Sequence, residues 1–416
     1  MAFRQMVFIG VIVSYFLALV YLSYQELYLA FPPGWARTAV QWVLTGGFFY
    51  IPVALVYLAF FGRQPVGLRN LVIGLVVGVF MTEVLLALFL VLTDIGLGAR
   101  ALVGYLLPGS LQPLSPGGRQ LIQQAALVVA VASFGSFLYG ITRGKYHYQV
   151  HRVPLQFPDL PPAFHGFRVA QISDVHAGSF DNIAKVKEGL ELVAAQHADL
   201  IVFTGDLVNG RAEEILPYTQ LFHDILRAPS GQYAVMGNHD YGHTHAWPSA
   251  AVQRENTAQV KANYAACGFE LLNNRSVAIT KGGDSIQLVG VENWGRPPFP
   301  QYGDLNAALH DVPPEAFKIL LSHDPTHWDL QVLPHAQHIH LTLAGHTHGM
   351  QMGVSMFGFQ WSPIKYFYPR WSGLYEVAQQ YLYVNRGFGW LGFPGRVGMF
   401  PEITVFELLR APGTTS

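Results

Sequence analysis

The sequence predicts an α/β fold that follows an all-helical membrane region. The chain of 416 residues is 51% hydrophobic and only 12% charged. Ionisable side chains are sparse before about position 142, whereas the histidines and most of the charges lie beyond it. After that position, short apolar segments alternate with segments of helical spacing, which is typical of α/β domains. The chain therefore has two chemically different parts.

Four apolar segments in the first part are each long enough to cross a bilayer, which takes about 20 helical residues. They cover residues 6–24, 39–61, 71–93 and 121–141. A cleaved signal peptide does not explain the first segment, because three more follow it. We therefore predict a domain of four transmembrane helices over residues 1–145. Glu83 is the one charged residue in these segments, and its role is either functional or structural, through a polar neighbour on another helix.

Lysine and arginine near the segment ends indicate how the chain crosses the membrane. Cationic residues are enriched on the cytoplasmic side, and with four spans both termini share one side. That side holds Arg4, Arg63, Arg69, Arg143 and Lys145, whereas the other holds Arg37, Arg100 and Arg119. We therefore expect the part that follows the membrane domain to be cytoplasmic.

The charge balance and the cysteine content exclude two classes of function. The formal net charge is -1, and there is no basic cluster of the kind that binds a phosphate backbone, so nucleic acid is not an expected partner. Cys267 is the only cysteine. A single thiol excludes an intramolecular disulfide framework and a cysteine-based zinc site.

The second part has the pattern of a buried sheet with flanking helices. We expect a first strand and a proline-rich linker at residues 146–166. A globular domain is expected at residues 167–410, and a disordered tail at residues 411–416. Continuous apolar segments indicate strands that are buried on both faces. Strands are expected at 167–173, 199–204, 233–236, 286–291, 317–321, 339–344, 381–384 and 402–408, and helices at 183–196, 213–227 and 256–266.

Polar side chains follow these strands in a repeated way. The interval from Asp174 to Asp206 equals that from Asp206 to Asn238, one strand–helix–strand step each time. In α/β sheets, sites form at the carboxyl ends of the strands. Each motif alone is commonplace, but five in order predict one site. The motifs are Asp174-Val175-His176, Gly205-Asp206, Gly237-Asn238-His239-Asp240, Ser322-His323-Asp324 and Gly345-His346-Thr347-His348.

The chemistry of these side chains predicts a dinuclear metal centre. Oxygen and imidazole ligands without thiolate suit Mn, Zn, Fe or Co. Asp206 has two carboxylate oxygens and can bridge two ions, while Gly205 before it allows a close approach of the backbone. Asn238 can ligate through its amide oxygen, and His239 beside it can transfer a proton. We therefore expect Asn238 and His239 to be the catalytic pair.

These motifs resemble those of the calcineurin-like metallophosphoesterase superfamily, over about residues 167–408. The resemblance implies two divalent metal ions and a four-layer α/β/β/α sandwich, with His239 facing the phosphate. It departs at Asn209, where many members have an acid. The first metal would be held by Asp174, His176, Asp206 and His348, and the second by Asp206, Asn238, His323 and His346.

Residues 171–176 and 349–351 resemble the membrane-associated bacterial branch of that superfamily more closely. This branch includes enzymes similar to UDP-2,3-diacylglucosamine pyrophosphatases. We expect a bacterial inner (cytoplasmic) membrane location. A catalytic domain tethered by a four-helix anchor would have easy access to membrane-borne phosphoesters. We therefore expect a hydrolase that cleaves a lipid-linked or membrane-proximal phosphodiester or pyrophosphate, with the bilayer and an acylated phosphoester as partners.

Two other functions fit parts of the sequence. A membrane sensor or partner-binding protein could retain the fold with little catalysis, although the intact ligands and His239 argue against it. A transporter with an accessory domain is less compatible, because four short-looped spans with one acid offer no evident path for a substrate. Hydrolysis therefore stays the leading hypothesis.

The region after His323 is unusually aromatic, particularly at residues 357–361, 366–371 and 387–393. These segments either form a rim that dips into the lipid headgroups or pack as loops over the sheets. Arg370, Arg386 and Arg396 in this region either neutralise a second phosphate or are ordinary surface ions.

Overall fold

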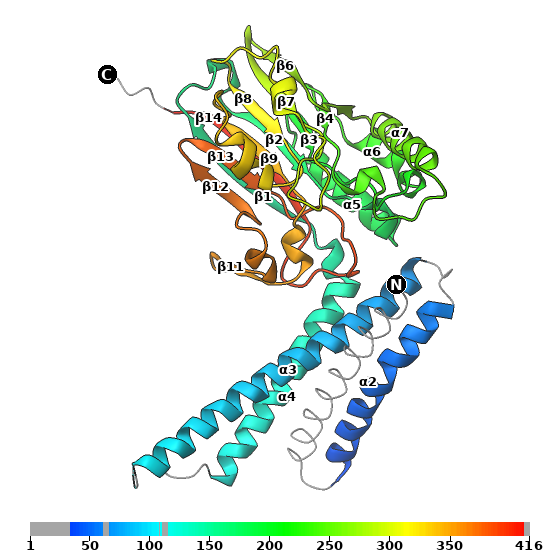
Figure 1. The fold of residues 1–416 in the computed structure, drawn as a ribbon, viewed down its shortest axis with the longest axis vertical. Coiled ribbons are helices and arrows are strands. Elements are labelled where there is room, and N and C mark those ends of the chain that lie inside the picture. Colours follow the sequence, from blue (N-terminus) through cyan, green and yellow to red (C-terminus); the bar gives the residue numbers. More distant parts are fainter. Residues whose placement is uncertain (1–33, 61–65, 108, 110–114, 412–416) are drawn as a thin grey trace. The chain divides into compact units, whose positions relative to one another are not determined.

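A computed structural model describes residues 34–60, 66–107, 109 and 115–411 of the chain (Figure 1). The chain divides into two compact units, Met1–Thr142 and Arg143–Ser416. The predicted membrane segment 6–24 and residues 412–416 of the predicted tail lie outside the described residues.

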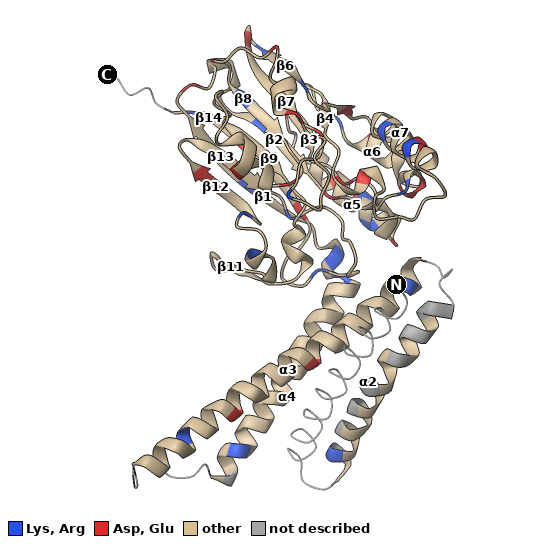
Figure 2. Ribbon diagram, viewed as in Figure 1, with Lys and Arg blue, Asp and Glu red and all other residues tan. Residues whose placement is uncertain are grey.

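The described part of the first unit consists of the helices α2 (Trp35–Phe60), α3 (Val66–Leu106) and α4 (Pro116–Thr142). Figure 2 shows few charged residues along them. Among the described residues, Val66–Leu106 and Gly117–Thr142 are long and apolar enough to cross a membrane. The helix α3 has 41 residues and extends well beyond the predicted segment 71–93.

Two glycines allow α3 to lie close to α4. A Cβ on Gly74 would come within 2.8 Å of the Ile141 side chain, and one on Gly78 within 3.2 Å of Phe137. Small residues four apart are a common means of close helix packing in membranes. Glu83 of α3 is buried inside this helical unit.

The second unit contains two six-stranded sheets. The first has the order β1 (Gln149–Phe157), β14 (Glu402–Arg410), β2 (Phe167–Ile172), β3 (Leu200–Phe203), β4 (Gln232–Ala234) and β5 (Glu270–Leu271). The second has the order β12 (Gly373–Val377), β13 (Gln380–Val384), β9 (Leu341–Ala344), β8 (Lys318–Leu321), β7 (Asp284–Gly290) and β6 (Arg275–Lys281). The strands β2, β3 and β4 are mutually parallel, as are β7, β8, β9 and β13.

The two sheets pack face to face. One apolar core joins Val169 and Val202 of the first sheet to Leu321 and Leu343 of the second. The strands β3, β8 and β9 are buried at every residue, because each also packs on its outer face, which explains their continuous apolar sequences. This arrangement confirms the predicted α/β fold.

The outer faces of the sheets are covered unequally. The first is covered by α5 (Ile183–Ala194), α6 (Thr219–Ile225) and α7 (Ala250–Ala266). The second is covered by the short helix α8 (Leu305–Ala308) and a five-residue π-helix, η6 (Trp328–Val332). A division into four layers stays a prediction, because this last cover is so thin.

Two of the predicted helices have different bounds in the structure, for local chemical reasons. The helix expected at 213–227 is a 3₁₀ turn, η4 (Ala212–Ile215), followed by α6, because Pro217 lacks an N–H and its ring disrupts a continuous helix. The helix expected from residue 256 already begins at Ala250, where the Ser249 hydroxyl accepts a hydrogen bond from the Val252 N–H at 3.3 Å.

The first aromatic segment, predicted to be a loop, is part of a β-hairpin. It is formed by β10 (Val354–Met356) and β11 (Phe359–Trp361), which pair only with each other. At its turn, Phe357 has φ 50° and Gly358 has φ 80°. Two positive φ values at the centre of a two-residue connection match the twist of a hairpin.

Candidate metal centre

Five parallel strands from both sheets deliver the candidate ligands to one place. Their carboxyl ends meet at the same edge of the sandwich, so side chains that are far apart in sequence lie together. Asp174 and His176 follow β2, Asp206 follows β3, Asn238 follows β4, His323 follows β8, and His346 and His348 follow β9. All of them lie in the unit Arg143–Ser416.

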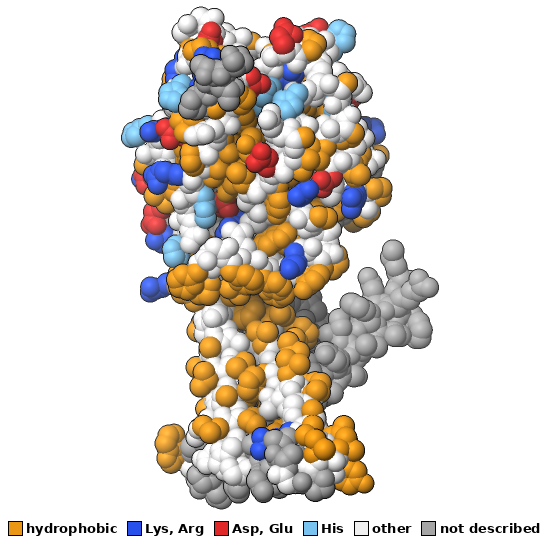
Figure 3. All heavy atoms as spheres, turned by 90° about the vertical axis from the view of Figure 1, so that its left-hand side faces the viewer, with side chains coloured by type: hydrophobic (Ala, Val, Ile, Leu, Met, Phe, Trp, Pro, Cys, Tyr) orange, Lys and Arg blue, Asp and Glu red, His pale blue; other side chains and the backbone are white. Residues whose placement is uncertain are grey.

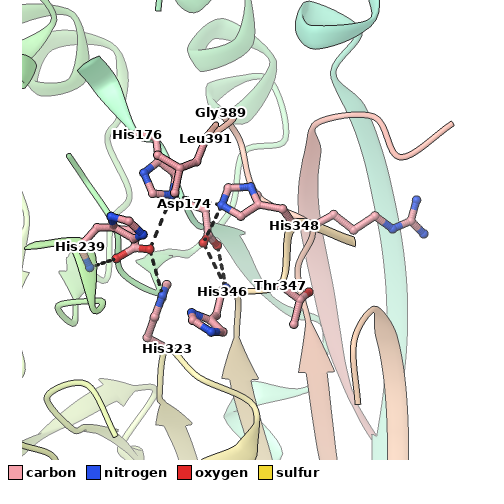
Figure 4. A network of polar contacts seen from close by, with 12 residues as sticks. Asp174, His176, His239, His323, His346, Thr347, His348, Gly389 and Leu391 are labelled. Carbon is pink, nitrogen blue, oxygen red and sulfur yellow. Dashed lines mark hydrogen bonds and ion pairs between the residues drawn. The ribbon is translucent and has the colours of Figure 1, made fainter. Parts of the chain in front are cut away.

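The side chains form two groups that could each hold a metal ion. One is Asp174, His176 and His348, and the other is Asp206, His323 and His346; the ligand atoms within each group lie within 4.8 Å of one another. Figure 4 shows His176 and His348 beside Asp174, with His323 and His346 beneath them.

Asp206 contacts both groups. One of its carboxylate oxygens, Oδ2, lies 3.2 Å from Nε2 of His323 and 3.5 Å from Nε2 of His176. Its other oxygen, Oδ1, accepts a hydrogen bond from the backbone N–H of His239 at 2.8 Å. Asp206 therefore lies where its carboxylate could ligate an ion held by either group.

Asn238 and His239 lie beside these groups. Oδ1 of Asn238 is 2.8 Å from Nδ1 of His346, which places the amide next to the second group. The His239 ring is 5.1 Å from that of His176, centroid to centroid, and Nδ1 of His239 is 3.1 Å from the carbonyl oxygen of Asn209. His239 is thus close to the candidate ligands without belonging to either group.

The donor atoms fit divalent cations. Nε2 of His176 and Nε2 of His348 face each other at 3.0 Å. Nε2 of His323 is buried and faces Asp206 without the geometry of a hydrogen bond. Nitrogens and carboxylate oxygens that lie this close together could ligate a cation, and a set of carboxylate, amide and imidazole ligands suits Mn, Fe or Zn.

Burial controls the charges of these groups. It lowers the pKa of His176 to about 3 and raises that of Asp174 to about 6. Burial opposes ionisation of Asp206 too, but His323 and His239 hold the pKa of this carboxyl well below its ordinary value. Burial also disfavours a charged His323, yet Asp206 raises the pKa of this imidazole to about 10. Asp206 and His323 therefore form an ion pair, while His176 is neutral.

Asp240 holds the loops after β3 and β4 together. Its buried carboxylate accepts hydrogen bonds from the backbone N–H groups of Asp206, Leu207 and Gly237, at 3.0, 2.9 and 2.9 Å. The hydroxyl of Tyr264 donates to the same carboxylate at 2.7 Å. Asp240 therefore positions Asp206 and Asn238 without belonging to either group of candidate ligands.

Three further side chains orient the candidate ligands. Oδ1 of Asn209 is 3.1 Å from Nδ1 of His176. Asn209 is the position at which many members of the superfamily have an acid, and its amide also contacts a candidate ligand. Nε2 of His346 is 2.8 Å from the Tyr368 hydroxyl and 3.5 Å from Oδ2 of Asp324. Contacts to the outward nitrogen of a ligating histidine fix its ring orientation.

Sequence reasoning singled out neither Tyr368 nor Asp324 as a contact of His346. The position of Asp324 directly after His323 was the one available signal for it. Tyr368 follows no strand and has no motif.

Several candidate ligands have a strained backbone. Positive φ values are rare for residues other than glycine and occur mainly at functional sites. Gly205 relieves the crowding next to one of these residues, because a Cβ there would lie 2.7 Å from Nδ1 of His323. The residues with positive φ are Asp174 (50°), His176 (49°), Asp206 (63°), His346 (73°) and His348 (52°).

The three arginines considered as phosphate ligands all have protein partners. Arg396 is fully buried, donates from Nε to the Gly389 carbonyl at 2.8 Å, and has Nη2 at 3.1 Å from Nδ1 of His348. Arg386 is buried and paired with Glu402 at 3.3 Å. The Arg370 guanidinium lies over the Trp328 and Tyr375 rings. Arg386 and Arg396 are therefore not surface ions; they stabilise the loops behind the site.

Two families of known proteins match this chain. Residues 167–350 match the family described as "Calcineurin-like phosphoesterase". Residues 4–145 match the family described as "Probable Calcineurin-like phosphoesterase, transmembrane domain". The second match confirms the predicted membrane region.

Individual relatives also resemble the chain. The uncharacterized metallophosphoesterase YkuE of Bacillus subtilis is 30% identical, over 60% of this chain and 81% of that protein. The transmembrane protein with metallophosphoesterase domain of Danio rerio is 27% identical over 69% of this chain, which spans only 62% of that relative. UDP-2,3-diacylglucosamine pyrophosphatase LpxG of Chlamydia trachomatis is 27% identical, over 61% of this chain and 88% of that protein.

The role of Asp240 is tested by Asp240→Asn. The amide keeps the shape of the side chain, but it turns one acceptor into a donor that faces backbone N–H groups. Leaving a buried donor unpaired costs about 1–3 kcal/mol, so we expect a lower melting temperature and a reduced metal content by elemental analysis. The control is Asp224→Asn at an exposed carboxylate. An unchanged melting temperature for Asp240→Asn would contradict this role.

Glu214 gives the fold a pH dependence. Its carboxylate accepts a hydrogen bond from the Asn209 N–H, and burial raises its pKa from 4.5 to about 7. Between these two values the folded chain holds a proton that the unfolded chain has released, so stability falls as pH rises through this window. We therefore expect the melting temperature of Glu214→Gln to fall less between pH 5 and pH 8 than that of the wild type.

The exposed Glu191 on α5 provides the control. Glu191→Gln should keep the wild-type dependence of melting temperature on pH. If Glu214→Gln also kept it, Glu214 would not be the group responsible.

Proposed function

The chain belongs to the calcineurin-like phosphoesterase family, and from this premise we propose that it is a membrane-anchored hydrolase with a dinuclear metal centre. We further propose that its substrate is a lipid-linked or membrane-proximal phosphodiester or pyrophosphate. The observation that carries this proposal is the position of Asp206, whose Oδ2 atom lies within 3.5 Å of a histidine from each group of candidate ligands.

Each candidate ligand receives a role in this proposal. Two bound divalent ions would polarise the phosphoryl oxygens and lower the pKa of an attacking water. Asp206 is shared, and Asn238 contributes its amide oxygen to the second ion. The first ion is assigned to Asp174, His176, Asp206 and His348, and the second to Asp206, Asn238, His323 and His346.

His239 is the proposed proton donor. The Asn209 carbonyl can only accept a hydrogen bond, so the contact at 3.1 Å places a proton on Nδ1 of His239. Nε2 is then the nitrogen that can act on the substrate. From it, His239 can stabilise charge that develops on the phosphoryl group or protonate the leaving oxygen.

The presence of a membrane domain favours a substrate that resides in the bilayer. A relative is named as a pyrophosphatase of a diacylated nucleotide sugar, and such a substrate carries both acyl chains and a pyrophosphate. We therefore assign residues 1–145 to anchoring, residues 146–166 to the connection and residues 167–410 to catalysis. We place the catalytic domain on the cytoplasmic side of a bacterial inner membrane.

The division between metal binding and proton transfer predicts different effects of two substitutions. Asp206→Ala should lose both metal and activity, because it removes the shared carboxylate. His239→Ala should keep its metal and lose about 10²- to 10⁴-fold in turnover, the usual contribution of a general acid. Elemental analysis and hydrolysis assays measure the two effects. The exposed His310 offers a matched histidine control, His310→Ala. Equal metal loss in Asp206→Ala and His239→Ala would contradict this division.

The substrate class is tested with full-length protein purified in detergent and loaded with Mn or Zn. A chromogenic diester, a chromogenic monoester and UDP-diacylglucosamine are compared, with Asp206→Ala as the inactive control. We expect the acylated nucleotide to be cleaved far faster than the soluble esters. Cleavage of the soluble esters alone would exclude the lipid-linked substrate, and no cleavage with any metal would favour a sensor.

A further inference from the structure

The β10–β11 hairpin and the turn η8 (Pro363–Tyr366) present a group of exposed apolar side chains. Phe357 at the hairpin turn is fully exposed, and Phe367 after η8 is 70% exposed. Figure 3 shows hydrophobic side chains gathered along one edge of the unit Arg143–Ser416. We call this surface the apolar edge; it consists of Val354, Met356, Phe357, Phe359, Tyr366 and Phe367.

The hairpin has one apolar face and one polar face. Met356 pairs with Phe359 across it, and Ser355 pairs with Gln360. An isolated two-stranded hairpin is marginally stable in water, and β10 is exposed at every residue. Contiguous exposed apolar patches on proteins mark contacts with other proteins or with membranes.

The chain that leaves the membrane domain attaches to the base of this hairpin. The His147 ring lies 4.8 Å from that of Phe400, centroid to centroid. In the same loop, the carbonyl of Val397 accepts a hydrogen bond from the N–H of Gly353, the residue before β10, at 2.9 Å. The base of the hairpin and the start of the unit are therefore connected through one loop.

A second set of contacts links the same parts. The Tyr146 ring meets the Trp390 ring edge to face, at 5.1 Å between centroids. The N–H of Leu391 donates to Oε1 of Gln351 at 2.6 Å, and Gln351 lies three residues before β10. Both sets of contacts therefore join the base of the hairpin to residues 146 and 147, at the start of the unit Arg143–Ser416.

The apolar edge also continues to the metal centre. Tyr368 directly follows Phe367 and has its hydroxyl 2.8 Å from Nε2 of His346. Between the hairpin and η8, the Ser362 hydroxyl donates to the carbonyl of Gly349 at 2.8 Å, next to His348. One short segment therefore carries both the exposed aromatic rings and a contact to a candidate ligand.

We infer that the apolar edge inserts into the boundary between headgroups and acyl chains of the bilayer that holds the N-terminal helices. Tyr is enriched at this boundary, and Phe side chains of interfacial segments are buried in it. Lys365 lies within η8, with Nζ 5.6 Å from the centroid of the Tyr366 ring, and suits anionic headgroups. The inserted edge delivers a lipid-borne phosphoester sideways to the metal centre, and this second part rests on the proposed function.

Insertion can be measured without any enzymatic activity. Cys267 is the only cysteine, it is buried, and burial raises the pKa of its thiol to about 12. A cysteine placed at Phe357 is therefore labelled selectively with an environment-sensitive fluorophore. Full-length Phe357→Cys is reconstituted in nanodiscs of phosphatidylethanolamine and phosphatidylglycerol, and His310→Cys serves as the water-exposed control.

We expect the label at position 357 to emit at shorter wavelength and to be quenched by lipids brominated on their acyl chains. The label at position 310 should be quenched by aqueous iodide instead. If iodide quenched both labels equally and brominated lipid quenched neither, insertion would be overturned.

Delivery is tested with the double variant Phe357→Ser and Phe359→Ser, neither of which is a candidate ligand. We expect kcat/KM for an acylated substrate in vesicles to fall at least about tenfold, because two apolar rings are lost from the bilayer. Hydrolysis of the soluble diester should not change. Equal rates on the vesicle substrate would overturn delivery. Failure of the wild type to hydrolyse any ester would refute the proposed function, while the quenching result still decides insertion.

Discussion

The carboxylate of Asp206 is the constraint on which the rest of the site depends. Its Oδ2 atom faces imidazoles of both groups, and its Oδ1 atom accepts the N–H of His239. A buried carboxylate between histidines is stable only when opposite charge lies close to it. His323 supplies that charge in the absence of metal, because its pKa is raised to about 10. Divalent cations would supply it when they bind.

The fold provides the rigidity that this arrangement requires. Strands such as β3 and β8 are buried on both faces, so their ends are fixed by packing before the polar residues begin. The N–H groups held by Asp240 then determine the path of the chain around Asp206. Positive φ at the candidate ligands persists because the surrounding packing and hydrogen bonds permit no relaxation.

Much of this could be predicted from the sequence, for an identifiable reason. The candidate ligands lie directly after apolar strands, and parallel strands bring their carboxyl ends to one edge, so local patterns were sufficient for Asp174, Asp206 and His323. Tyr368 was not predictable, because its contact with His346 depends on the path of a loop 22 residues further along the chain. The hairpin at Phe357 was missed since its strands have three residues each, too few to show a period.

The proposed insertion of the hairpin would also change how the membrane region relates to the proposed catalysis. An anchor alone would raise the local concentration of a lipid substrate, but it would not bring a phosphate out of the headgroup layer to the buried candidate ligands. In this chain the segment between β9 and β10 holds His346 and His348, and Tyr368 follows η8 and contacts His346. On the proposed insertion, a bilayer that bound Phe357 and Phe367 would act on the same segment that contacts a candidate ligand. Access of the substrate and the geometry of the second group of candidate ligands would then be coupled through about twenty residues of chain.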